Sequence, residues 1–202
     1  QGVLYHDIPS SVNRDGGSGP SRCHHGHLRD QSDIKILLDI NVQVSDQEVS
    51  SGREDTMEYT YEKLVPAHEN DVMHIFNHYT QNSFAAYPEG VVPNLLFLRF
   101  LEIGKTHPAY AITSGDGTVV GFCLLRPYNP FAAFKETAEV SYFIRHDHTG
   151  KGIGKSALRK LEEDAKNLGI RHLLADISSE NRESVEFHER NGFTRCGYFN
   201  NI

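Results

Sequence analysis

Three glycines at alternate positions in the run HTGKGIGKSAL, residues 148–158, constrain the fold of this chain more than any other segment. An apolar, strand-like segment precedes the run and helix-forming residues follow it, so we expect strand, loop and helix in succession. A helix amino terminus carries unpaired N–H groups and a partial positive charge, and glycines let an anion approach the bare backbone. Lys151 and Lys155 add positive charge. The segment therefore predicts a phosphate-binding loop.

Two common phosphate loops fit this run incompletely. A Walker A loop needs a glycine where this chain has Thr149, which disfavours a nucleoside triphosphate. The dinucleotide fingerprint is met by Gly152, Gly154 and Ala157, with Asp176 at a suitable distance to hold a ribose. That motif normally opens the first βαβ unit, whereas four strands are expected between residue 57 and this loop. A dinucleotide therefore stays open as the weaker alternative.

Hydrophobic periodicity places the loop within a mixed α/β (α+β) chain. The segments expected as strands are 34–44, 57–65, two within 109–128, 137–145, 170–178 and one after 193, and those expected as helices are 66–82, 93–104, 154–168 and 181–191. Residues 1–33 are rich in Gly, Ser, Asp, Arg and His, which is typical of a flexible arm. We therefore expect an N-terminal extension over residues 1–56, strand included, and one domain over residues 57–202.

Composition excludes several classes of function. A net charge of -7 argues against a general nucleic-acid binder, whose surface is basic. The 3 cysteines form no CxxC pair, which favours a reducing compartment over a disulfide framework. No apolar run has membrane-spanning length, so a cytoplasmic protein without a membrane partner is expected. The crowded CHHGH at residues 23–27 lacks the ligand spacing of a folded zinc site, and no metal is expected.

Several motifs together resemble the GNAT superfamily of N-acetyltransferases. TGKGIG resembles its [QR]-G-x-G-x-[GA] pyrophosphate loop, with Thr149 where Gln or Arg is usual, and NRESVEFHERNGF at 181–193 resembles its last helix. The segments 82–90 and 124–144 are similar to its phosphinothricin-type branch. The resemblance covers about residues 57–199. It implies a mixed, mostly antiparallel central sheet flanked by about four helices.

The resemblance also implies a cosubstrate, acetyl-CoA. The pyrophosphate would be held by the loop residues Thr149, Gly150, Lys151, Gly152, Ile153, Gly154 and Lys155. The pantetheine arm would bond to the main chain of Phe143 and Ile144, and Asn181 and Ser184 would line the cofactor.

Acetyl transfer to an amine requires a neutral nucleophile and a proton for the leaving thiolate. Glu89 and Glu139 are equally favoured as the base that deprotonates the ammonium group. Asn181, Ser184 and His188 share one helical stripe, and His188 can donate a proton near neutral pH. Most of the superfamily has Tyr at this position, while the phosphinothricin-type branch often has His. His188 is therefore the expected acid.

The acceptor is expected to be a small amino-acid-like amine. Phe84, Tyr87, Arg126 and Tyr128 would shape its pocket, and Arg126 could hold a substrate carboxylate. A homodimer is also expected. The alternatives are acetylation of protein or peptide amines and a non-catalytic CoA-binding homologue.

The chain departs from the resemblance at its C-terminal end, because the family continues with one further strand after GYFNNI. IKILLDINVQV at residues 34–44 has the character of that final strand. We therefore expect this segment to occupy the vacant sheet position beside residues 194–199, in a permuted or swapped arrangement.

Overall fold

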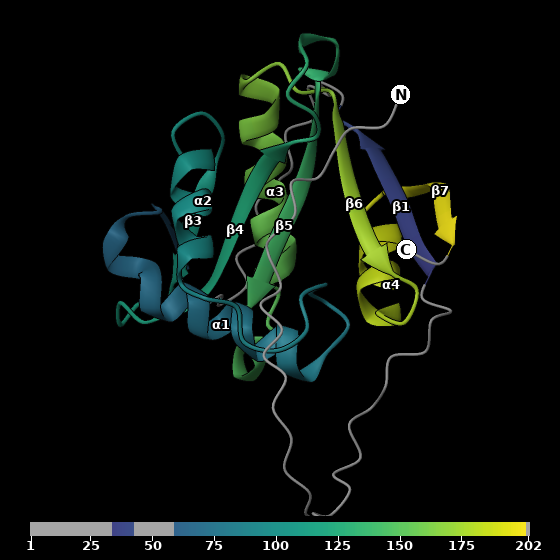
Figure 1. The fold of residues 1–202 in the computed structure, drawn as a ribbon. Coiled ribbons are helices and arrows are strands. Elements are labelled where there is room, and N and C mark those ends of the chain that lie inside the picture. The colour runs from purple at the N-terminus through teal and green to yellow at the C-terminus, as the bar shows by residue number, and fades with distance from the viewer. Residues whose placement is uncertain (1–33, 43–58, 201–202) are drawn as a thin grey trace, which may run out of the picture.

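A computed structural model describes residues 34–42 and 59–200 of the chain, and these residues form one seven-stranded sheet with four α-helices (Figure 1). The strands are β1 (Ile34–Asn41), β2 (Thr60–Lys63), β3 (Ala109–Thr113), β4 (Val119–Pro127), β5 (Thr137–Ile144), β6 (His172–Ser178) and β7 (Thr194–Asn200). The helices are α1 (Glu69–Asn82), α2 (Leu95–Ile103), α3 (Ile153–Asn167) and α4 (Arg182–Arg190). Three short 3₁₀ turns lie at Pro66–His68, Ala132–Phe134 and His146–His148.

The sheet order is β2-β3-β4-β5-β6-β1-β7, and every neighbouring pair is antiparallel except β5 with β6. The predicted mixed, mostly antiparallel sheet with four helices is confirmed. No helix within the described ranges combines the length and apolar character needed to cross a membrane.

The helices bury two apolar cores, one on each face of the sheet. Val72, Phe76 and Phe97 of α1 and α2 pack against β3 and β4 in one core. Leu161 of α3 and Val185 of α4 belong to the other. The apolar residues of α3 recur at intervals of three and four, so one stripe of the helix is buried while its charged residues face solvent.

β5 and β6 lie side by side only at their beginnings. Their parallel pairing runs from Thr137 opposite His172 to Glu139 opposite Leu174, although both strands continue beyond these residues. Figure 1 shows the two strands separating toward their carboxyl ends. The sheet therefore opens at the end of β5 from which the glycine loop departs.

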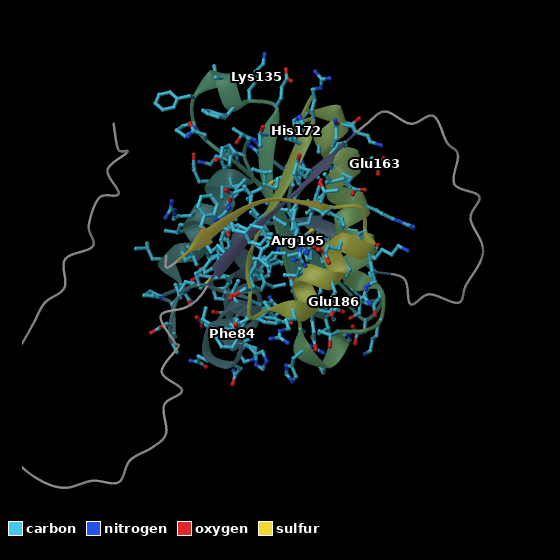
Figure 2. All side chains as sticks on the ribbon, turned by 90° about the vertical axis from the view of Figure 1, so that its right-hand side faces the viewer. Phe84, Lys135, Glu163, His172, Glu186 and Arg195 are labelled. Carbon is cyan, nitrogen blue, oxygen red and sulfur yellow. The ribbon has the colours of Figure 1, made fainter. Side chains whose placement is uncertain are left out.

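β1 fills the position between β6 and β7. It pairs antiparallel with both, for example Lys35 with Ser178 of β6 and with Phe199 of β7. Figure 2 views the molecule from this edge, with Arg195 of β7 labelled near the centre. The expected placement of this strand beside residues 194–199 is confirmed. The predicted arm at residues 1–33, the CHHGH run and the domain boundary at residues 56–57 lie outside the described residues.

Alternate residues of β1 belong to the core, as expected for a central strand. Ile36 is 6% exposed and Leu38 is 0% exposed, and both join the core cluster of α3 and α4. The Cδ1 atom of Ile40 lies 3.3 Å from where a Cβ would stand on Gly192, so this glycine also makes room for β1. β7 joins the sheet only through β1.

We predict that Leu38→Ala lowers the free energy of unfolding by ~2–5 kcal/mol, because it truncates a fully buried side chain that packs in the core under β1. Urea denaturation followed by circular dichroism measures the change. Asn41→Ala, at an exposed position of the same strand, is the control and should change stability by less than ~0.5 kcal/mol. Equal effects of the two substitutions would contradict the burial of β1 between β6 and β7.

Candidate active site

A cavity of about 430 Å³ lies where β5 and β6 separate. Side chains from α1, α2 and the loop between them meet side chains from β4, β5, β6 and α4 around it. Its apolar part includes Phe76, Phe100 and Phe122. The residues that give it polar groups are Tyr87, Arg99, Arg126, Ser141, Tyr142, Asp176, Asn181, Ser184 and His188. Polar groups therefore converge in a largely apolar pocket, as is usual for small-molecule sites.

The glycine loop adopts a conformation that requires glycine. Gly150 and Gly152 have φ of 73° and 79°, in the left-handed region, and α3 begins directly after Gly152. A Cβ on either glycine would meet no atom within 4 Å, so the backbone is open to a ligand. Lys151 and Lys155 are exposed, and neither forms an ion pair within the described ranges. The loop thus presents free charge and backbone donors beside the open end of β5.

Other residues of the loop hold it together. The Thr149 hydroxyl donates to the carbonyl of His146 at 2.9 Å, and a Cβ on Gly154 would lie 3.6 Å from the Phe187 ring of α4. Arg145 contacts His148 at 2.8 Å and forms an ion pair with Asp147. Burial and the positive charges of Lys151 and Arg145 lower the pKa of His148. Thr149 therefore shapes the loop through its hydroxyl, while Gly154 fits it against α4.

The predicted stripe on α4 faces the cavity. Asn181, Ser184 and His188 all line it. Asn181 also caps the helix, because its Oδ1 accepts a hydrogen bond from the Ser184 N–H at 3.3 Å. These residues are brought together as expected, and their roles toward a cofactor stay predictions.

His188 has two contacts from Nδ1 to Ser184, with the carbonyl oxygen at 2.7 Å and the hydroxyl at 3.5 Å, and one from Nε2 to Tyr142; the shorter contact at Nδ1 defines its tautomer. Nδ1 lies 2.7 Å from the carbonyl oxygen of Ser184, which can only accept, so Nδ1 carries the proton. Nε2 lies 2.5 Å from the Tyr142 hydroxyl and accepts a hydrogen bond from it. His188 is 4% exposed, and this burial lowers its pKa, opposed in part by the bond to Ser184. Burial raises the pKa of Tyr142. Both groups are therefore neutral at neutral pH.

The two predicted carboxylate bases do not line the cavity. Glu139 forms an ion pair with Arg126, which does line it, and Glu89 is exposed in the loop between α1 and α2. The carboxylate in the wall is Asp176, which accepts a hydrogen bond from Tyr87 at 2.8 Å and lies 3.4 Å from the Lys35 ammonium group. The base assignment stays a prediction.

The predicted acceptor residues divide into two pairs. Tyr87 and Arg126 line the cavity, whereas Phe84 and Tyr128 do not. Tyr128 instead packs edge-on against Phe134, with ring centroids 5.6 Å apart. Among the predicted pantetheine contacts, Phe143 lines the cavity, while the Ile144 carbonyl accepts a hydrogen bond from Tyr79 at 2.5 Å.

Four polar residues of the cavity, Arg99, Ser141, Tyr142 and Asp176, were not predicted as catalytic, cofactor-binding or acceptor-binding residues of an acetyltransferase. Arg99 comes from α2, where the sequence indicates only an amphipathic helix. Tyr142 is adjacent to Phe143, and strand alternation alone places it on the other face of the sheet. Asp176 was considered only as a ribose ligand, and it is instead held by Tyr87 and Lys35. No group of three or more His, Cys, Asp or Glu side chains able to hold a metal occurs in the part of the chain that the structure describes.

Solved structures share this architecture. A GNAT superfamily phosphinothricin acetyltransferase from Sinorhizobium meliloti, in complex with AcCoA, has a TM-score of 0.65 and 27% identity, covering 69% of this chain and 76% of that one. A ribosomal-protein-alanine N-acetyltransferase from Brucella melitensis has a TM-score of 0.63 and 27% identity, covering 68% of this chain and 86% of that one.

The sequence model of the Acetyltransferase (GNAT) family matches residues 70–193, more than half of the chain. The chain belongs to the GNAT family. β1 lies outside the matched residues, so the family match does not account for this strand.

Curated GNAT relatives agree with the phosphinothricin-type resemblance. An L-methionine sulfoximine/L-methionine sulfone acetyltransferase of Pseudomonas paraeruginosa is 34% identical over 91 residues, 45% of this chain and 53% of the relative. The L-amino acid N-acyltransferase MnaT of Escherichia coli is 27% identical over 124 residues, 60% of this chain and 72% of the relative. The chain therefore spans only about half the length of the Pseudomonas protein.

We predict that His188 makes stability depend on pH. Burial lowers the pKa of His188 in the folded protein below its ordinary value of about 6.5. The unfolded chain therefore binds this proton more tightly than the folded protein does. Lowering the pH from about 6.5 toward the folded-state pKa therefore destabilises the wild type. The loss of stability is about 1.4 kcal/mol for each tenfold loss of proton affinity on folding.

In the His188→Gln variant, the side chain at position 188 cannot bind a proton in this pH range. The stability difference between wild type and His188→Gln should shrink as the pH falls from about 7.5 to about 5, measured by urea unfolding at each pH. A difference that stays constant over this range would show that folding leaves the pKa of His188 unchanged.

Proposed function

We propose that this chain binds acetyl-CoA and transfers the acetyl group to the primary amine of a small amino-acid-like acceptor by direct attack. The observation that carries the proposal is the continuity of two features. The open glycine loop lies at the end of β5 where the sheet separates, and the separation leads to a cavity that contains His188. A cofactor with a pyrophosphate and a long reactive arm fits this arrangement.

The residues present fit acetyl-CoA along its length. The N–H groups that follow Gly150 and Gly152, with Lys151 and Lys155, suit the pyrophosphate. Phe143 pairs with Phe122 of β4, in the register in which the Arg145 N–H donates to Val120, so the main chain of Phe143 faces β4. The main chain of Ile144 faces the open side, where its carbonyl accepts the Tyr79 hydroxyl, so Ile144 suits the pantetheine arm better than Phe143. Acetyl-CoA, when bound, supplies the activated acetyl group. The S. meliloti relative was solved with AcCoA, which supports the same ligand here.

The cavity favours a small acceptor that carries an acid group. Its volume is about 430 Å³, and much of its wall is apolar. Arg126 is paired with Glu139 and Asp176 with Lys35, whereas Arg99 has no ion-pair partner within the described ranges. The unpaired guanidinium can bind a carboxylate of the acceptor. The names of the Pseudomonas and E. coli relatives also point to amino-acid-like acceptors.

The chemical steps fall to side chains around the cavity. Glu89 and Glu139 remain the proposed groups that remove the ammonium proton of the acceptor, either directly or through water. Glu139 would act from its ion pair with Arg126, the partner that lines the cavity. His188 remains the proposed source of the proton for the leaving thiolate. A cytoplasmic location and a homodimer also stay predictions.

Acetylation of a protein or peptide amine is the second candidate. The Brucella relative is named for acetylation of a ribosomal-protein alanine, and it shares this fold at 27% identity. The enclosed apolar wall around Phe76 and Phe100 favours a small acceptor over a protein chain. A non-catalytic CoA-binding homologue differs from both candidates because it would acetylate no amine.

The test of the function begins with binding of acetyl-CoA, measured by isothermal titration calorimetry, and continues with thiol release across a panel of amines. We expect binding in the micromolar range and thiol release with amino acids, methionine sulfone or phosphinothricin. Release only with an N-terminal peptide would select the second candidate. Binding without release from any amine would indicate a non-catalytic homologue, and binding of NADH in place of acetyl-CoA would overturn the proposal.

We predict that Gly152→Val raises KM for acetyl-CoA at least about 10-fold, because a β-branched residue resists positive φ and its side chain occupies the phosphate approach. Gly117→Val is the matched control. Gly117 has φ of 81° and equally open surroundings, but it lies in the turn between β3 and β4.

Both variants should lose similar stability, and only Gly152→Val should weaken acetyl-CoA binding in calorimetry. If Gly117→Val weakened binding equally, backbone strain rather than the loop would explain the effect. If neither variant changed KM, the loop would not be the pyrophosphate site.

A further inference from the structure

We propose that Tyr142 and His188 form one proton relay, in which the oxygen of Tyr142 exchanges protons with the reacting nitrogen and sulfur while His188 stores the proton. The inference rests on the proposed function. It adds Tyr142 as a catalytic residue and changes the part of His188 from a direct donor to a carrier.

The relay follows from the shortest hydrogen bond at each ring nitrogen of His188. Its only N–H points at the Ser184 carbonyl at 2.7 Å, so His188 has no proton of its own to offer a ligand in the cavity. Its free lone pair, on Nε2, receives the Tyr142 hydroxyl at 2.5 Å. A proton can therefore reach or leave Nε2 only through the oxygen of Tyr142.

Aromatic packing fixes the relative position of the Tyr142 and His188 rings. The rings of Tyr142 and His188 are stacked, with centroids 5.5 Å apart and an interplanar angle of 21°. Phe187 packs edge-on against Tyr142 at 5.9 Å, and Phe193 packs edge-on against His188 at 4.9 Å. Neither ring can swing away without disrupting these contacts, so the hydrogen bond is pre-organised.

The relay lies where the reaction would take place. Tyr142 belongs to the part of β5 that has separated from β6, and it lines the cavity together with Ser184 and His188. No ion pair involves His188 among the described residues, so its imidazole is not held in the charged form by a carboxylate. Burial lowers the pKa of His188 and raises that of Tyr142, which keeps both neutral before the reaction.

The proton movements balance within the pair. When the neutral amine attacks the acetyl carbon, a proton leaves the nitrogen for the Tyr142 oxygen as the Tyr142 proton passes to Nε2 of His188. As the carbon–sulfur bond breaks, Nε2 returns its proton to Tyr142, and Tyr142 gives its own to the sulfur. One proton has moved from nitrogen to sulfur, and both side chains are restored. The acylated nitrogen is acidic, so a weakly basic imidazole suffices to accept its proton.

The tautomer is tested first on the protein without ligand. Long-range ¹H–¹⁵N NMR of the imidazole ring distinguishes a proton on Nδ1 from one on Nε2, and His188→Gln assigns the resonance. We expect Nδ1–H. An Nε2–H tautomer would overturn the relay, because His188 would then already be a donor toward Tyr142.

Kinetics provide the second test. Tyr142→Phe removes only the hydroxyl and should lower kcat about 100-fold while KM for acetyl-CoA changes less than about 3-fold. Tyr110→Phe is the matched control, since it also removes a hydroxyl bonded to another side chain, Asp164 at 2.9 Å, but outside the cavity. It should keep the wild-type kcat. Wild-type turnover by Tyr142→Phe would refute the relay.

A double-variant cycle separates a relay from two independent residues. Gln at position 188 can still accept the Tyr142 hydroxyl but cannot store its proton, so His188→Gln should lose as much kcat as Tyr142→Phe. In one relay the double variant loses no more than either single variant. Losses that multiply would overturn it. If the wild type binds acetyl-CoA but acetylates no amine, the proposed function fails, and the NMR tautomer still decides whether the arrangement is the one inferred.

Discussion

The separation of β5 from β6 is the constraint on which the site depends. Parallel pairing stops at Glu139 and Leu174, and beyond that point neither strand can satisfy its backbone through the other. The space is lined instead by Tyr142 and Ser141 from β5 and by Asp176 from β6. The same separation leaves the glycine loop beside an open end of the sheet, so the proposed phosphate site and the cavity both follow from a single break in hydrogen bonding.

The opening remains stable because the sheet on both sides of it is anchored independently. On one side β4 pairs with β5 from Gly121 to Pro127, and Phe122 of β4 stacks on Phe143 of β5. On the other, β1 pairs with β6 along its whole length. The contact between Tyr142 and His188 then bridges the two sides, because Tyr142 belongs to β5 and His188 to the helix that follows β6.

Features encoded by local sequence could be predicted, and contacts between distant residues could not. The glycine loop follows from positive φ and helix initiation within a few residues, and the α4 stripe follows from helical spacing. Tyr142 and His188 are 46 residues apart, and Tyr87 and Asp176 are 89 apart. Their meeting depends on strand order and on the face that each strand presents, which periodicity does not reveal. The strand at residues 34–44 was placed by its resemblance to a missing strand, and the contact of its Lys35 with Asp176 in the cavity wall had no local signal.

The position of β1 has a consequence for how the chain folds as it is synthesised. Lys35 and Asp39 leave the ribosome first, yet partners such as Asp176 and Thr194 follow them by 141 and 155 residues. Until those partners emerge, the apolar side chains of Ile36 and Leu38 have no sheet to enter. Such long-range pairing forms slowly, and an unpaired apolar strand is prone to associate with other chains. The β1 segment therefore has the greatest need of a chaperone during synthesis, until β6 and β7 have been made.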